Sequence, residues 1–141
     1  NMFYDAVSFD QSLASWNVLA VLDMSYMFCN ATSFNQPLTA WDVDNVRDMK
    51  WMFYKASSFN QELDDWDVSK VTDMQRMFLF ASSFNQSLSS WDVSNVVNMG
   101  GIFLFASSLT NQSFTSWDVS SVTNHVDFIR DTGGGNSEPS W

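Results

Sequence analysis

Residues Phe84 to Met99 read FNQSLSSWDVSNVVNM, and close variants of this phrase recur along the whole chain. Its tryptophan sets the period, because Trp16, Trp41, Trp66 and Trp91 are each 25 residues apart and Trp117 follows after 26. Self-similarity at a fixed period of about 20 to 50 residues is typical of repeat architectures. The sequence therefore predicts five copies of one motif, preceded at Asn1 to Tyr4 by the end of a truncated copy.

Each copy is predicted to contain two short elements. Val46, Met49, Met52, Phe53 and Ala56 are spaced as on one face of a helix. The expected N-cap position is filled by Asp44, Ser69, Ser94 and Ser120. The segment LxxWDV instead alternates about its Trp and Val, as a short strand does. The predicted fold class is thus an α/β leucine-rich-repeat-like solenoid, with about five repeats of 25 residues, a parallel sheet on one side and short helices on the other.

The same phrase predicts how the copies are held together and where they end. The Trp and Val columns should face inward, and the Asn-Gln pairs should tie successive copies through amide hydrogen bonds. These pairs begin at Asn35, Asn60, Asn85 and Asn111. The pattern stops after Asp131, and the remaining TGGGNSEPSW contains Gly, Ser and Pro. We expect one domain over residues 1–131 and a Gly/Ser-rich tail or linker over residues 132–141.

Composition excludes several classes of function. Six Lys and Arg against sixteen Asp and Glu give a net charge of −10, which cannot supply the basic groove that nucleic acid requires. No apolar run is long enough to insert into a bilayer. Cys29 and His125 are the only Cys and His, and no phosphate loop or spaced metal-ligand motif is present. We therefore expect a protein that is not an enzyme and has no cofactor, except for weakly bound calcium.

A row of carboxylates is the candidate binding surface. Asp42, Asp67, Asp92 and Asp118 follow the tryptophans of four consecutive copies and should stack about 4.8 Å apart on the sheet face. One interpretation is solubility together with hydrogen bonds to adjacent backbone. The other is a row of oxygen ligands for a cationic partner or for Ca²⁺, with a weak calcium site at Asp67 and Asp92.

One asparagine is a candidate for modification. Asn30, Ala31 and Thr32 form an N-x-S/T sequon. Two further sequons begin at Asn85 and Asn111, but these residues belong to the amide ladder. Asn30 is therefore the glycosylation candidate if the protein is secreted.

The repeated phrase WDVSNVxxMxxMFxxASSFNQxL resembles the repeat of BspA-like leucine-rich-repeat surface proteins, and more narrowly a branch of unknown function first noted in lipoproteins of wall-less bacteria and also found in microbial eukaryotes. The resemblance covers residues 1 to 131 and implies an extracellular or cell-surface location. From it we expect an interaction or adhesion module that binds a protein or glycan through its sheet face. The alternative is a structural subunit that docks into a larger assembly by its ends or flank.

Overall fold

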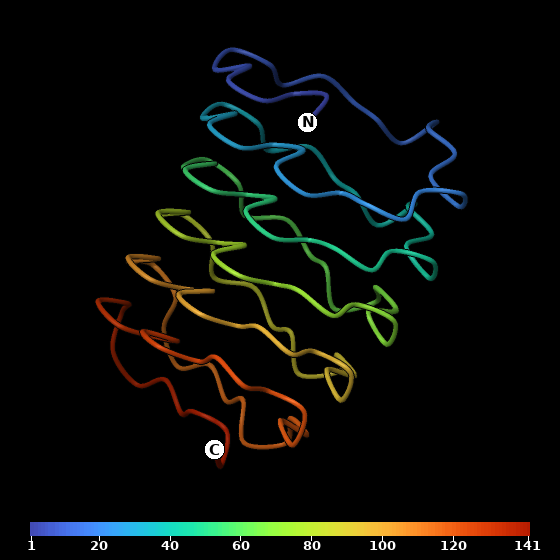
Figure 1. Ribbon diagram of the computed structural model, residues 1–141. Coiled ribbons are helices and arrows are strands. Elements are labelled where there is room, and N and C mark those ends of the chain that lie inside the picture. The colour runs from blue at the N-terminus through green and yellow to red at the C-terminus, as the bar shows by residue number, and fades with distance from the viewer.

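The computed structural model describes residues 1–141 and contains no α-helix and no extended strand. Its regular pairing is limited to isolated parallel bridges. Four of these join successive copies at one repeat position, through Asp23, Asp48, Asp73, Asn98 and Asn124, and a fifth joins Ser113 to Ser137. The predicted α/β leucine-rich-repeat solenoid, with a parallel sheet and a layer of helices, is therefore wrong. The chain is instead a stack of irregular loops, one above another, with the two termini at opposite ends (Figure 1).

The segment predicted to be a helix is a series of linked turns. Met52 N–H donates to Met49 O at 3.2 Å, and Ala56 N–H donates to Phe53 O at 3.0 Å, so these bonds span three residues rather than the four of an α-helix. Between them, Trp51 N–H and Phe53 N–H donate to the next copy, at Gln75 O and Met77 O. Linked turns of this kind bury residues at the same intervals as one face of a helix does, which is why the apolar spacing suggested a helix.

The segment predicted to be a strand also bends. Trp66 N–H donates to Leu63 O and Val71 N–H donates to Val68 O, which closes a turn on either side of the WDV triplet. No sheet forms there, so the sheet face assigned to this segment does not exist. The alternation itself is present, because Trp66 and Val68 are buried while Asp67 is exposed.

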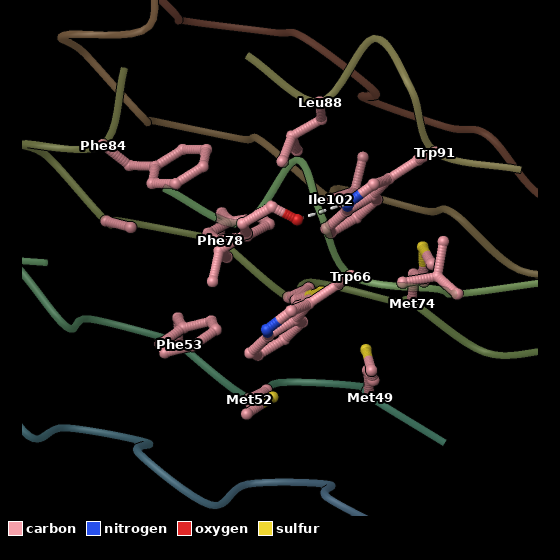
Figure 2. Close-up of a cluster of buried hydrophobic side chains, with 14 of the residues drawn as sticks. Met49, Met52, Phe53, Trp66, Met74, Phe78, Phe84, Leu88, Trp91 and Ile102 are labelled. Carbon is pink, nitrogen blue, oxygen red and sulfur yellow. Dashed lines mark hydrogen bonds between the residues drawn. The ribbon is translucent and has the colours of Figure 1, made fainter. Parts of the chain in front are cut away.

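The core consists of columns of identical side chains, one from each copy. Phe28, Phe53, Phe78 and Phe103 stack at successive centroid distances of 5.5, 5.5 and 5.6 Å. Met, Val and Leu columns fill the space beside them. Figure 2 shows Met49, Met52 and Met74 in this cluster. Because every copy offers the same shape to its neighbours, the same packing is reproduced at each interface.

The inner tryptophans are buried as predicted, and their indole groups also link the copies. Trp41, Trp66, Trp91 and Trp117 are no more than 5% exposed. Each donates from Nε1 to a leucine carbonyl of the preceding copy, as Trp91 does to Leu63 O at 2.9 Å (Figure 2). A buried indole N–H needs such a partner. Tryptophan therefore serves this column better than phenylalanine would.

The predicted amide ladder is confirmed in the middle of the stack. Asn60 Oδ1 accepts hydrogen bonds from Asn85 N–H at 2.9 Å and from Gln86 Nε2 at 3.0 Å. Asn35 does the same for Asn60 and Gln61. The single-residue insertion then displaces Asn111, and Thr110 N–H occupies its place on Asn85 Oδ1 at 3.0 Å.

The C-terminal segment lies against the last copy. Phe114 N–H donates to Ser137 O at 2.9 Å, and Gln112 N–H donates to Asn136 Oδ1 at 2.9 Å. The Trp141 ring stacks on His125 with centroids 4.1 Å apart. Residues 132–141, predicted to be a tail or linker, thus cover part of this end of the stack.

Candidate interaction surfaces

The predicted acidic row is exposed, and its carboxylates cap turns. Asp42, Asp67, Asp92 and Asp118 each accept through Oδ1 the backbone N–H two residues further on, at 2.9 to 3.2 Å. The hydroxyl and backbone N–H of Ser69 lower the pKa of Asp67, and those of Ser120 lower the pKa of Asp118. The backbone interpretation of this row therefore has direct geometric support.

Nothing in the arrangement of acids gathers a metal-ligand set. The structure contains no group of three or more His, Cys, Asp and Glu side chains placed to hold a metal ion. The calcium site at Asp67 and Asp92 stays a prediction, as does recognition of a cationic partner by this row.

A second polar row lies at the bridge positions, where the sequence predicted the first turn of a helix. Asp23, Asp48 and Asp73 each accept through Oδ1 the N–H two residues on, as Asp48 does from Lys50 at 3.0 Å. Asn98 and Asn124 continue the row. These side chains cap the turn that begins at each bridge position, so their role is structural.

The glycosylation candidate Asn30 is half-buried and has a φ of 61°. Its Nδ2 donates to Asp5 Oδ1 at 2.5 Å. Modification at Asn30 stays a prediction, and a glycan on Nδ2 would compete with this contact.

Two backbone positions in each copy adopt positive φ, and large side chains occupy many of them. The first column contains Tyr26, Trp51, Arg76, Gly101 and Asp127, and the second contains Asp5, Asn30, Lys55, Phe80, Phe105 and Asp131. Gly, Asn and Asp tolerate this conformation, whereas aromatic and long side chains are strained in it. Tyr26, Trp51, Phe80 and Phe105 therefore occur where local backbone preference disfavours them.

One continuous surface feature combines these four aromatic residues with Tyr54. We call it the aromatic stripe, and its members are Tyr26, Trp51, Tyr54, Phe80 and Phe105. Tyr26 stacks on Trp51 at 5.8 Å, and Trp51 meets Tyr54 edge-on at 4.9 Å. Tyr54 meets Phe80 at 6.3 Å, and Phe80 stacks on Phe105 at 4.7 Å. Phe80 and Phe105 are 40% and 39% exposed, whereas Tyr26, Trp51 and Tyr54 are half-buried, so the exposed end of the stripe lies at the Phe80 and Phe105 copies.

Two cations border the aromatic stripe. The Arg76 guanidinium lies 4.8 Å from the centre of the Trp51 ring, and Lys55 Nζ lies 5.1 Å from that of Tyr54. Both side chains are exposed. Aromatic residues and arginine are the types enriched at protein interfaces and among the residues that dominate their binding energy.

The first tryptophan lies near the N-terminal end of the stack, where the sequence begins within a copy. Trp16 is 38% exposed, and its indole makes no hydrogen bond, unlike those of the four later tryptophans. Trp16, Val21, Met24 and Met27 help to line an apolar hollow of about 350 Å³.

Comparison with known families gives one match. Residues 1–81 and residues 37–140 each match the model of a family described as "Mycoplasma protein of unknown function, DUF285". The chain belongs to the DUF285 family. No curated protein and no solved structure shows significant similarity to it.

Membership of DUF285 brings no functional residues with it, so the surfaces of this DUF285 chain are interpreted from their own geometry. Sequence reasoning missed the aromatic stripe because its members fall at different positions of the repeat. A signal was nevertheless present. The three tyrosines of the chain are Tyr4, Tyr26 and Tyr54. They occupy repeat positions at which the residue type differs from one copy to the next. The structure contains no helix that could cross a bilayer.

Proposed function

We propose that this DUF285 chain is a non-enzymatic interaction module of the BspA-like branch, located at the cell surface or outside the cell, and that it binds another protein through the aromatic stripe. The observation that carries the proposal is the presence of exposed aromatic side chains at strained, positive-φ positions. Strained residues persist where the surrounding structure holds them, and they concentrate at functional sites.

The fold itself supplies no reason for these side chains. Gly101 occupies the Trp51 position of a later copy, and Asn30 occupies the Phe80 position of an earlier one, so smaller residues are compatible with the same backbone. Exposed aromatic rings at such sites add strain and unfavourable hydration. A binding surface is the function that offsets both costs, because docking removes the rings from water.

The test compares two matched surface variants. Phe80→Ser with Phe105→Ser removes the exposed end of the aromatic stripe, and Asp67→Asn with Asp92→Asn removes two charges of the acidic row. Binding of the labelled chain to purified extracellular proteins and surface polysaccharides is measured for each. We expect the stripe variant to lose binding and the acidic-row variant to keep it. The opposite pattern would transfer the function to the acidic row and overturn the proposal.

A further inference from the structure

Arg76 is held in place by a stack of aromatic groups. Tyr26 and Arg76 come from the copies on either side of the Trp51 copy, and both lie against the Trp51 ring. The side chain of Arg76 makes no ion pair and no hydrogen bond within the chain. Stacking uses the face of a guanidinium and leaves its N–H donors free at the edge, in the geometry that binds a carboxylate through two bonds.

Most of the other basic side chains are already engaged. Lys50 pairs with Asp48 at 2.5 Å, Arg130 pairs with Asp127 and Asp131, and Lys70 donates to Asn45 Oδ1. Arg47, Lys55 and Arg76 make no ion pair although the chain has sixteen acids for six bases, and Lys55 and Arg76 lie on rings of the aromatic stripe. Two free cations beside an exposed aromatic surface indicate a ligand that brings its own negative charge.

There is also space beside Arg76. A hollow of about 90 Å³ is lined by Arg76, Gly100, Gly101, Asn124 and Asp127, among others. Gly101 stands in the column of Tyr26, Trp51 and Arg76 but has no side chain, and a Cβ added to it would lie 3.4 Å from Arg76 Cγ. This volume matches about three water molecules, which is enough for a carboxylate. Asp127 lines the same hollow, but its carboxylate is paired with Arg130 at 3.2 Å.

We propose that Arg76, with the hollow at Gly101, recognises carboxylates of an acidic, aromatic-containing segment of a partner protein, and that Lys55, on the Tyr54 ring of the same stripe, adds a second positive charge. This inference rests on the proposed function and names the partner of the same surface. A protein segment fits better than a glycan, because the stacked rings of Phe80 and Phe105 have no hydrogen-bond donor or acceptor. A sugar could stack its C–H face on these rings, but the rings offer no hydrogen bonds to its hydroxyl groups.

The test uses a poly(Glu,Tyr) copolymer as the probe, with polygalacturonate as a carboxylate-bearing glycan and polyglutamate as a charge control. Binding to the full chain is measured by fluorescence anisotropy at low and high salt. We expect poly(Glu,Tyr) to bind most tightly, and Arg76→Gln to weaken it by about tenfold, as for the loss of a charge-assisted hydrogen bond. Arg76→Lys should retain part of the affinity. Arg47→Gln removes the same charge from an exposed side chain outside the stripe and should change affinity less than about twofold.

The outcomes separate this inference from the proposed function. If Phe80→Ser with Phe105→Ser abolishes binding while Arg76→Gln leaves it unchanged, the aromatic stripe binds partners but the carboxylate inference is wrong. Equal or tighter binding of polygalacturonate, with the same dependence on Arg76, would overturn the choice of a protein partner. No binding of any of the three polymers would overturn the inference as a whole. Unchanged melting temperatures show that the variants are folded.

Discussion

At the scale of single residues, each inner tryptophan combines a packing role with a hydrogen-bonding role. The ring of Trp66 is 4% exposed, and its Nε1 donates to Leu38 O at 3.2 Å. Losing the ring leaves a cavity, whereas losing only the N–H removes one of the two hydrogen bonds that Leu38 O accepts, the other coming from Trp41 N–H at 3.0 Å. The two contributions can therefore be separated by substitution.

Trp66→Ala should destabilise the protein by about 3–5 kcal/mol, the range for a large aromatic in a packed core. Trp66→Phe removes the indole hydrogen bond and part of the ring and should cost about 1–3 kcal/mol, while Leu38 O keeps its bond from Trp41 N–H. Urea unfolding followed by circular dichroism measures both. Trp141→Phe is the control, since Trp141 is 42% exposed, and it should cost much less. Equal stability of Trp66→Phe and wild type would show that the indole hydrogen bond contributes nothing.

Positive φ angles are the second property at this scale. Lys55 has a φ of 55°, a conformation that costs a side chain with a Cβ about 1–2 kcal/mol. Lys55→Gly relieves this strain but gives the unfolded chain about 0.5–1 kcal/mol of extra entropy. We expect a net gain of up to about 1 kcal/mol in urea unfolding. Lys70→Gly, at a position without positive φ, should instead lose stability. A loss of similar size in both variants would rule out backbone strain at Lys55.

At the scale of elements, hydrogen bonds between copies replace secondary structure. All 62 backbone hydrogen bonds lie outside helices and strands, in turns and between neighbouring copies. Backbone groups must be paired when buried, and here the next copy provides the partner. The amide ladder is the side-chain part of this system, with Asn60 Oδ1 accepting two bonds from the following copy.

Asn60→Ala removes both of these acceptor contacts and should cost about 1–3 kcal/mol. Asn60→Asp should cost less at neutral pH, because a carboxylate can accept the same two bonds. Asp10 already does so for Asn35 N–H and Gln36 Nε2, each at 2.9 Å. Thermal unfolding at pH 7 distinguishes the variants, with Asn95→Ala as an exposed control that loses one contact, to Ser69 O. If Asn60→Asp is as damaging as Asn60→Ala, the acceptor role of this position is wrong.

Side-chain positions were more predictable from the sequence than backbone conformation. The buried Trp, Val, Met and Phe columns and the amide ladder follow from a period of 25 residues, because equal spacing places equal residues at equal sites. The helix at Val46 to Ala56 was wrong because linked turns bury residues at the same intervals. Only the positive φ at Trp51 and Lys55 separates the two conformations, and neither residue is a type that indicates it. The aromatic stripe was missed because its members come from different positions of the repeat.

At the scale of the whole molecule, the net charge of −10 means that carboxylates repel one another, and this repulsion lowers the stability of the folded chain. At Asp44 this repulsion acts together with a larger effect, the loss of hydration. Loss of hydration, and then the charges of Asp42 and Asp67, raise the pKa of Asp44 above its ordinary value of 3.8. Other copies have Ser69, Ser94 and Ser120 at this position. The neighbouring Asp67 behaves oppositely, because hydrogen bonds from Ser69 lower its pKa.

These shifts predict opposite pH dependences. A carboxyl whose pKa is raised by folding binds its proton more tightly in the native state, so its contribution to stability falls as pH rises through the window above 3.8 and stays unfavourable at neutral pH. Asp44→Ser should therefore raise the melting temperature at pH 7, and this gain should shrink below pH 3.8. A lowered pKa, as at Asp67, favours the native state above its unfolded value and loses that contribution as pH falls through the folded pKa. Asp67→Asn should accordingly lose stability at pH 7 and little at low pH.

Melting curves of the two variants and wild type from pH 3 to pH 8 test both signs together. A gain from Asp44→Ser that does not change over this range would mean that serine improves the turn itself, and that repulsion among the carboxylates contributes little.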